Sequence, residues 1–150
     1  MSNASNDDNY AMDYRSAMAA FESKHFSQAI KLLFPFASEG DANAQHLVAI
    51  MYQNGLGVAR NDEQAFKWMN ASADQGYSIA EHGMGFMYLE GECVEKNGEK
   101  AAEWFQKAAD QGLQGSLTTL AIMYEQGNGV PRDPEKAKAL YKQAGFDEMG

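Results

Sequence analysis

Apolar residues recur along most of the chain with the spacing of amphipathic helices. Tyr14, Ala17, Met18 and Phe21 fall at positions i, i+3, i+4 and i+7, so they share one face of a predicted helix. A second helical pattern follows after a short polar break. Together the two patterns predict a helix–turn–helix unit over about residues 9–40.

The pattern then repeats with a fixed period. Tyr52, Tyr88 and Tyr124 precede three similar loops, and their spacing is 88 − 52 = 36 and 124 − 88 = 36 residues. A period of this size is typical of helical repeat arrays. It predicts three further two-helix units, at about 41–76, 77–112 and 113–147. Their first helices are predicted at 42–54, 78–90 and 114–126, and their second helices at 61–75, 97–111 and 133–145.

Residues at the predicted helix ends repeat as well. A glycine, which tolerates the left-handed conformation of a helix C-cap, follows each first helix. An Asn or Asp, whose side chain can accept hydrogen bonds from first-turn amides, precedes each second helix. These residues are Gly55, Gly91 and Gly127, and Asn61, Asn97 and Asp133.

Large apolar residues of the second helices are predicted core. Trp68 and Trp104 occupy equivalent positions, and Leu140 takes their place in the last unit. Burial of one such aromatic side chain stabilises a fold by about 2–3 kcal/mol. We therefore expect truncation of Trp104 to destabilise the array strongly.

Composition and charge narrow the class of protein. The formal net charge of −9 and the lack of a basic stripe disfavour nucleic acid as a partner. No apolar run is long enough to insert into a membrane. Residues 1–8 are polar and are predicted to be a disordered lead or an expression remnant. The sequence therefore predicts a soluble protein and leaves a cytoplasmic or periplasmic location open, because an export signal could have preceded this N-terminus.

The repeated residues resemble Sel1-like repeats, which are relatives of the tetratricopeptide repeat. The third loop and second-helix start read Gly-Asn-Gly-Val-Pro-Arg-Asp-Pro-Glu-Lys-Ala over 127–137, and the best second helix reads Lys-Ala-Ala-Glu-Trp-Phe-Gln-Lys-Ala-Ala-Asp-Gln-Gly over 100–112. The first unit, 9–40, is more similar to a divergent tetratricopeptide repeat. The resemblance implies an all-α fold, a right-handed α/α superhelix of about four helix–turn–helix repeats and eight helices, in a single domain over 9–147.

The family resemblance also implies a function. Sel1-like proteins generally act as adaptors that hold proteins together, often in bacterial signalling, secretion or cell-envelope processes. A cysteine-rich branch has been linked to penicillin binding, but this chain has only Cys93, so that activity is not carried over. The resemblance implies a concave surface lined by the first helices.

Residues at fixed offsets from the three tyrosines are predicted to line that concave groove. The hypothesis is a peptide-binding groove with an apolar stripe, and the alternative is that the apolar members are core. An acidic surround favours basic partners. The candidate residues are Asn43, His46, Ile50, Gln53, Ile79, His82, Phe86, Leu89, Thr118, Ile122 and Glu125.

The sequence offers little sign of catalysis. His46 and His82 lie one period apart, but no carboxylate or second cysteine is placed to complete a metal site with them. Cys93 has acidic neighbours, which disfavour a thiolate. We therefore expect a non-enzymatic protein without cofactor, with no catalytic or metal-binding residues. An accessory hydrolase remains the less favoured alternative.

The last unit departs from the pattern in a way that suggests self-assembly. Gly145 arrives three residues earlier than the period demands, and no polar capping helix follows. Solenoid ends need capping. The alternative function is therefore a structural repeat protein that forms a homodimer through its C-terminal end.

Overall fold

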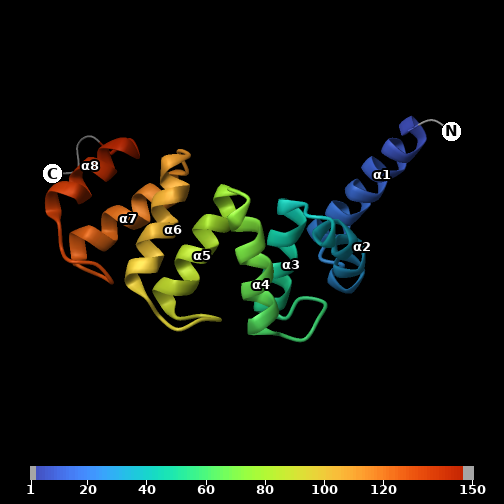
Figure 1. Ribbon diagram of the computed structural model, residues 1–150, viewed down its shortest axis with the longest axis horizontal. Coiled ribbons are helices and arrows are strands. Elements are labelled where there is room, and N and C mark those ends of the chain that lie inside the picture. Colours follow the sequence, from blue (N-terminus) through green and yellow to red (C-terminus); the bar gives the residue numbers. More distant parts are fainter. Residues whose placement is uncertain (1–2, 147–150) are drawn as a thin grey trace. The chain divides into compact units, whose positions relative to one another are not determined.

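The computed structural model describes residues 3–146, with side chains from Asn9 onward. This part of the chain contains eight α-helices and no strand (Figure 1), which confirms the all-α class. The helices are α1 (Asn3–Glu22), α2 (Phe26–Ser38), α3 (Ala42–Asn54), α4 (Asp62–Asp74), α5 (Ser78–Glu90), α6 (Gly98–Asp110), α7 (Gln114–Gln126) and α8 (Pro134–Gln143).

The helix bounds follow the predicted period closely. The three first helices begin and end where the sequence predicts, and the second helices begin one residue later than predicted. The exception is α1, which begins at Asn3, within the predicted disordered lead. No glycine or proline occurs between Asn3 and Glu22, so no helix-breaking residue separates the start of α1 from the rest of the helix. Met1 and Ser2 lie outside the described residues.

The predicted caps are present. Gly55, Gly91 and Gly127 end α3, α5 and α7 in the left-handed conformation, with φ of 67°, 69° and 68°. The side chains of Asn97 and Asp133 accept hydrogen bonds from the backbone N–H groups of Lys100 and Lys136, at 3.0 and 3.1 Å. These caps fix where each helix starts and stops.

Each loop between paired helices closes on a tyrosine of the repeat. The carbonyl oxygens of Tyr52, Tyr88 and Tyr124 accept hydrogen bonds of 2.9, 2.8 and 2.8 Å from the residue that caps the following helix. The tyrosine side chains are half-buried. The motif that carries the period is therefore part of the architecture.

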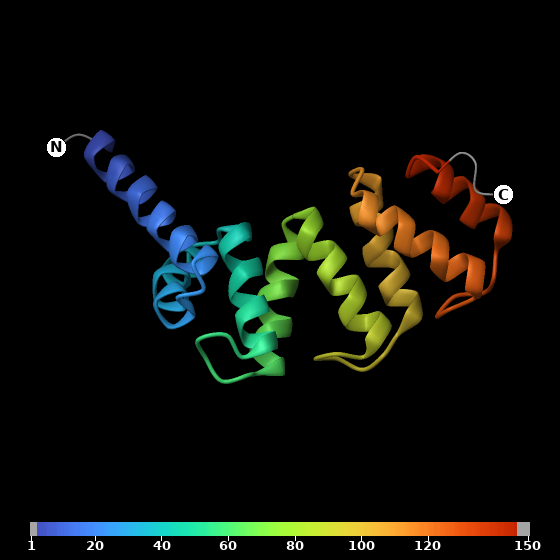
Figure 2. The same cartoon turned by 180° about the vertical axis from the view of Figure 1, so that it is seen from behind.

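The chain divides into two compact units, with the division after Ser72 near the end of α4. In unit 1, α2 packs against both α1 and α3. In unit 2, α5 packs against α6, α6 against α7, and α7 against α8. Both long loops of unit 2 lie at the same end of its helix pairs (Figure 2).

The core of unit 2 centres on Phe105, Leu120 and Met123, which are almost completely buried. Trp104, the expected core aromatic, is only half-buried, and its ring lies 4.4 Å from the Lys107 Nζ. Its equivalent Trp68 is buried as predicted, and Leu140, which the uncapped end was expected to leave partly exposed, is buried as well. The adjacent Phe105 is completely buried, and its equivalents Met69 and Tyr141 are also buried.

Candidate interaction surfaces

The four candidate positions of unit 1 lie on α3, and their side chains are half-buried. They are Asn43, His46, Ile50 and Gln53. The Asn43 Nδ2 donates to the Tyr14 hydroxyl at 2.8 Å and lies 3.5 Å from the Met18 sulfur. Asn43 therefore holds α3 against α1 within the unit.

Tyr14 connects three elements of unit 1. Its hydroxyl donates to the Asp41 Oδ2 at 3.1 Å, and the same oxygen accepts from the Ala44 N–H at 2.8 Å, capping α3. Burial raises the pKa of Tyr14, so its hydroxyl keeps the proton that it donates. Sequence reasoning missed this network because its members are 27 and 29 residues apart and do not recur in the other repeats.

The structure brings His82 and Phe86 together with residues from two other helices of unit 2. The His82 Nδ1 lies 2.6 Å from the hydroxyl oxygen of Ser116, which is fully buried on α7. The His82 ring meets the rings of Phe86 and Phe105 edge-on, at centroid distances of 4.9 and 5.3 Å. Burial lowers the pKa of His82, so the imidazole is neutral at pH 7.

Gly85 provides the space for this aromatic cluster. A Cβ at Gly85 would lie 2.6 Å from the Phe105 ring carbon Cε1. The Phe86 and Phe105 rings also meet edge-on, with centroids 5.0 Å apart. His82 and Phe86 are thus tied to the interior of unit 2, although both side chains remain half-buried.

Two candidate residues of unit 2 expose large apolar side chains. Ile79 on α5 is 44% exposed and Ile122 on α7 is 38% exposed. Thr118 lies one turn before Ile122, and its hydroxyl donates to the Gln114 carbonyl at 3.1 Å. Leu89, by contrast, packs against the core of unit 2. Large apolar side chains that stay exposed on a helix are available for contact with a protein partner.

Glu125 belongs to a contact between α7 and α8. Its carboxylate accepts from the Tyr141 hydroxyl at 3.2 Å. Burial first, and then the Glu125 charge, raise the pKa of Tyr141, so the hydroxyl remains a donor. Glu125 therefore positions α8 as well as adding negative charge to this end of α7.

Burial also lowers the pKa of His46. Among the described residues, no group of three or more His, Cys, Asp or Glu side chains could hold a metal ion.

Cys93 is half-buried in the α5–α6 loop and adopts a φ of 68°, at the position where the other two repeats have Gly57 and Gly129. No helix in the described part of the chain is long and apolar enough to cross a membrane.

Sequence reasoning missed a cleft in unit 2 that does not involve the predicted groove positions. It has a volume of about 580 Å³ and lies between α6 and the segment from the end of α7 to the start of α8. Its lining residues are Glu99, Ala102, Glu103, Gln106, Lys107, Tyr124, Val130, Pro131 and Lys136. The 36-residue recurrence of tyrosine, valine and lysine at 88, 94 and 100 and at 124, 130 and 136 was the available signal.

Comparison with protein families matches the Sel1 repeat over residues 42–77, 78–113 and 118–145. The match begins at the start of α3 and does not include α1 and α2. No curated protein matches the chain.

Three solved structures show the same repeat fold. One is c5321, a protective antigen of uropathogenic Escherichia coli, with 33% identity, a TM-score of 0.75, and coverage of 77% of this chain and 25% of that one. Another is a Sel1 repeat protein from Oxalobacter formigenes, with 27% identity, a TM-score of 0.80, and coverage of 88% and 53%. The chain thus spans about a quarter and about half of these two relatives.

The third structure is cysteine-rich protein B of Helicobacter pylori. It has 17% identity and a TM-score of 0.64, with coverage of 79% of this chain and 87% of that one. At this identity the likeness concerns the fold alone. The Escherichia coli and Oxalobacter formigenes relatives are bacterial and suggest a bacterial origin for this chain.

Proposed function

Because the chain belongs to the Sel1 repeat family, as its motifs predicted, we propose that it is a non-enzymatic adaptor that binds a segment of a partner protein through its first helices. Sel1 repeats commonly mediate protein–protein interaction, and the fold is typically a non-catalytic scaffold. The proposal assigns the binding surface to the first-helix residues named above, with α5 and α7 as its best-supported part.

The observation that carries this proposal is the exposure of Ile79 and Ile122 on the first helices of unit 2. Between them in the chain, Phe86 is half-buried and rigidly supported by Phe105. Exposed apolar groups and an aromatic ring held in place supply contact area at low entropic cost. The net charge of −9 favours a basic partner by electrostatic steering.

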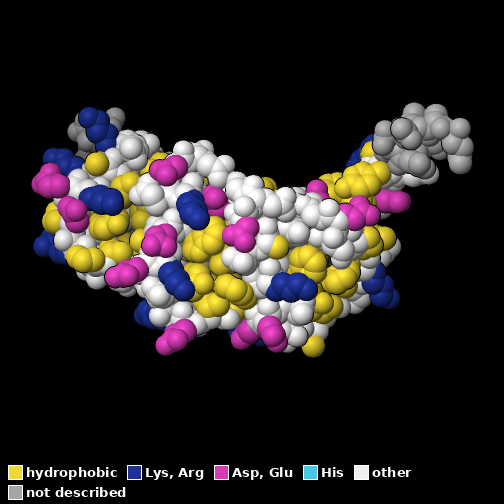
Figure 3. All heavy atoms as spheres, in the orientation of Figure 1, with side chains coloured by type: hydrophobic (Ala, Val, Ile, Leu, Met, Phe, Trp, Pro, Cys, Tyr) yellow, Lys and Arg dark blue, Asp and Glu magenta, His cyan; other side chains and the backbone are white. Residues whose placement is uncertain are grey.

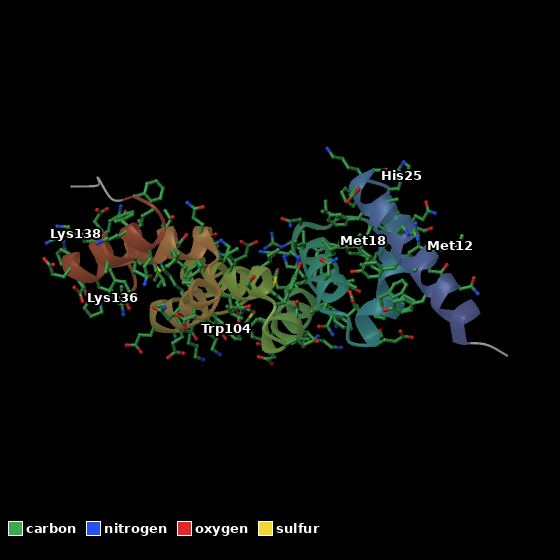
Figure 4. All side chains as sticks on the ribbon, turned by 90° about the horizontal axis from the view of Figure 1, so that it is seen from above. Met12, Met18, His25, Trp104, Lys136 and Lys138 are labelled. Carbon is green, nitrogen blue, oxygen red and sulfur yellow. The ribbon has the colours of Figure 1, made fainter. Side chains whose placement is uncertain are left out.

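The test is comparative capture of partners from a lysate of the source cell. The variant carries Ile79→Glu and Ile122→Glu, which place charge on two exposed positions and should leave the helices folded. A matched control, Met12→Glu with Ser16→Glu, adds the same charge to exposed positions on α1, where Figure 4 shows Met12. We expect capture to be lost for the first variant and kept for the control. Capture that survives Ile79→Glu/Ile122→Glu, with circular dichroism unchanged, would contradict the assigned surface.

The proposal places this adaptor in bacterial signalling or in an envelope-related process. The Escherichia coli relative is a protective antigen, which supports an envelope setting. Fractionation of source cells followed by immunodetection distinguishes the two settings.

Self-assembly is the second candidate function, and Phe146 favours it. This residue follows α8 and is 41% exposed, with its ring 6.3 Å from that of Tyr141. By contrast, Lys138 is exposed on α8 at the position where α6 has the buried Ala102. The apolar surface at this end is therefore limited, and Phe146 is its exposed aromatic residue. Light scattering over a concentration series tests the idea: a dimer that Phe146→Asp converts to a monomer would support self-assembly.

A further inference from the structure

The cleft between α6 and the α7–α8 segment has an apolar floor and a charged rim. Tyr124 and Val130 are half-buried, while Pro131 is exposed at the edge. Ala102 of α6 is buried below them. Figure 3 shows apolar side chains exposed among charged ones over this part of unit 2. The cleft can therefore accept the carbon atoms of a side chain and still offer charge at its mouth.

The two lysines at the rim have partners within the protein. The Lys136 Nζ lies 4.5 Å from the Tyr124 ring centroid and donates to the Tyr124 hydroxyl at 3.2 Å. The Lys107 Nζ lies 4.4 Å from the Trp104 ring centroid. Trp104 and Lys136 appear on the same side of unit 2 in Figure 4. Ring faces attract ammonium groups, so both cations are partly satisfied.

The two glutamates at the rim are not matched in this way. Glu99 and Glu103 are exposed and stand four residues apart on α6, so they lie on the same face one turn from each other. Neither makes a hydrogen bond or an ion pair with any residue that the structure describes. The four charged residues of the lining sum to zero, and the two that lack a contact with the described part of the protein are the carboxylates.

A related cleft one repeat earlier helps to separate architecture from recognition. It is lined by the equivalent residues Tyr88, Val94 and Lys100, and the Lys100 Nζ lies 5.5 Å from the Tyr88 ring centroid. At the position of Pro131 it has Glu95 instead. The tyrosine–valine–lysine wall thus belongs to the repeat. The apolar edge at Pro131 and the Glu99–Glu103 pair occur only in the cleft between α6 and the α7–α8 segment.

We propose that this cleft binds an arginine side chain from an extended segment of a partner protein. The planar guanidinium can donate to both carboxylates, Glu99 and Glu103, in the bidentate manner that arginine favours. Its aliphatic stem packs on Val130 and Pro131, and the net charge of −9 draws cationic segments toward the protein. This site is separate from the first-helix surface, so each can fail without the other.

The test uses three capped pentapeptides, Gly-Leu-X-Leu-Gly, in which X is arginine, its neutral isostere citrulline, or glutamate. Binding is followed by amide chemical shifts of the ¹⁵N-labelled full chain. We expect the arginine peptide to shift amides of α6 and the α7–α8 loop. We expect the citrulline peptide to bind at least about tenfold more weakly, because charge-assisted hydrogen bonds are lost.

Matched variants locate the effect. Glu99→Gln with Glu103→Gln should remove the preference for arginine over citrulline. Glu22→Gln with Glu90→Gln removes the same charge from exposed positions elsewhere and should preserve it. The Ile79→Glu/Ile122→Glu variant should also preserve it. The proposal would be overturned by equal binding of the arginine and citrulline peptides or by tighter binding of the glutamate peptide to the lysines. It would also be overturned if millimolar peptide caused no amide shifts, or shifts only outside the cleft.

Discussion

The missing side chain at Gly85 is a structural requirement of the central repeat. Its φ is ordinary for a helix, so the glycine is not there for backbone freedom. A Cβ would come within 2.6–2.8 Å of three atoms of the Phe105 ring. The preceding repeat has Ala49 at this position and Met69 in place of the phenylalanine, and both are buried. In the central repeat the Phe105 ring therefore occupies the space that a methyl group at position 85 would need.

We expect Gly85→Ala to lower the free energy of unfolding by about 1–3 kcal/mol, because the added methyl overpacks the core. In a Phe105→Met background the same change should raise that free energy by up to about 1 kcal/mol, because alanine is the better helix former. Urea denaturation of the four proteins measures both effects. An equal cost of Gly85→Ala in the two backgrounds would show that Phe105 is not the obstacle.

The lowered pKa values of His82 and His46 predict a loss of stability in mild acid. Both imidazoles are held neutral by burial, whereas an unfolded histidine has a pKa of about 6.5. The unfolded state therefore binds more protons, and stability present above about pH 6.5 declines as the pH falls below that value. His82→Asn should reduce the drop in melting temperature between pH 7.5 and 5.0, since Asn can keep a hydrogen bond to Ser116.

The exposed His25, in the turn between α1 and α2, provides the control for removing one imidazole. His25→Asn should leave the pH dependence of the melting temperature close to that of the wild type. If His82→Asn and His25→Asn gave the same pH profile, burial of His82 would not be the source of acid sensitivity.

At the scale of elements, the sequence predicted the repeat well because its determinants are local and recur. Helix bounds, the left-handed glycines and the Asn and Asp caps all follow from short windows of sequence. Other features could not be predicted, since they depend on contacts of individual side chains that do not recur from repeat to repeat. Trp104 stays half-buried beside Lys107, Asn43 donates to Tyr14, and Glu125 accepts from Tyr141. The cleft between α6 and the α7–α8 segment likewise requires residues from two repeats to meet.

Close contact between elements makes a second glycine irreplaceable. A Cβ at Gly98, at the start of α6, would lie within 2.6 Å of three backbone atoms of Gly129 in the α7–α8 loop. Gly115 in α7 offers a contrast, because a Cβ there would be an ordinary 3.5 Å from the His82 ring. The loop therefore rests directly on the neighbouring helix, with no room for side chains between them.

We expect Gly98→Ala to destabilise the protein by about 1–3 kcal/mol, because backbone must move to admit the methyl group. Gly115→Ala should stabilise it by up to about 1 kcal/mol through helix propensity. Thermal and urea unfolding should show a lower free energy of unfolding for Gly98→Ala and a higher one for Gly115→Ala. Destabilisation by both would mean that the cost comes from altered helix starts and not from contact with the loop.

At the scale of the whole molecule, stability in a repeat protein is approximately a sum of unit terms and nearest-neighbour terms. Unit 1 has a core residue, Leu33, that is completely buried in α2, and unit 2 has Leu120, equally buried in α7. Leu120 belongs to the core cluster of unit 2, and α2, which carries Leu33, packs against α1 and α3 of unit 1. Each leucine can therefore serve as a probe of how far a local defect spreads.

Leu120→Ala should cost about 2–5 kcal/mol through lost burial and a residual cavity. We expect hydrogen exchange, followed peptide by peptide, to accelerate most in α6, α7 and α8 and least in α1 and α2, since opening free energies differ between local units. Leu33→Ala is the reciprocal variant and should accelerate exchange first in α1, α2 and α3. Equal acceleration along the whole chain after either substitution would instead mean that the two units unfold as one cooperative block, because a defect in one would then be felt fully in the other.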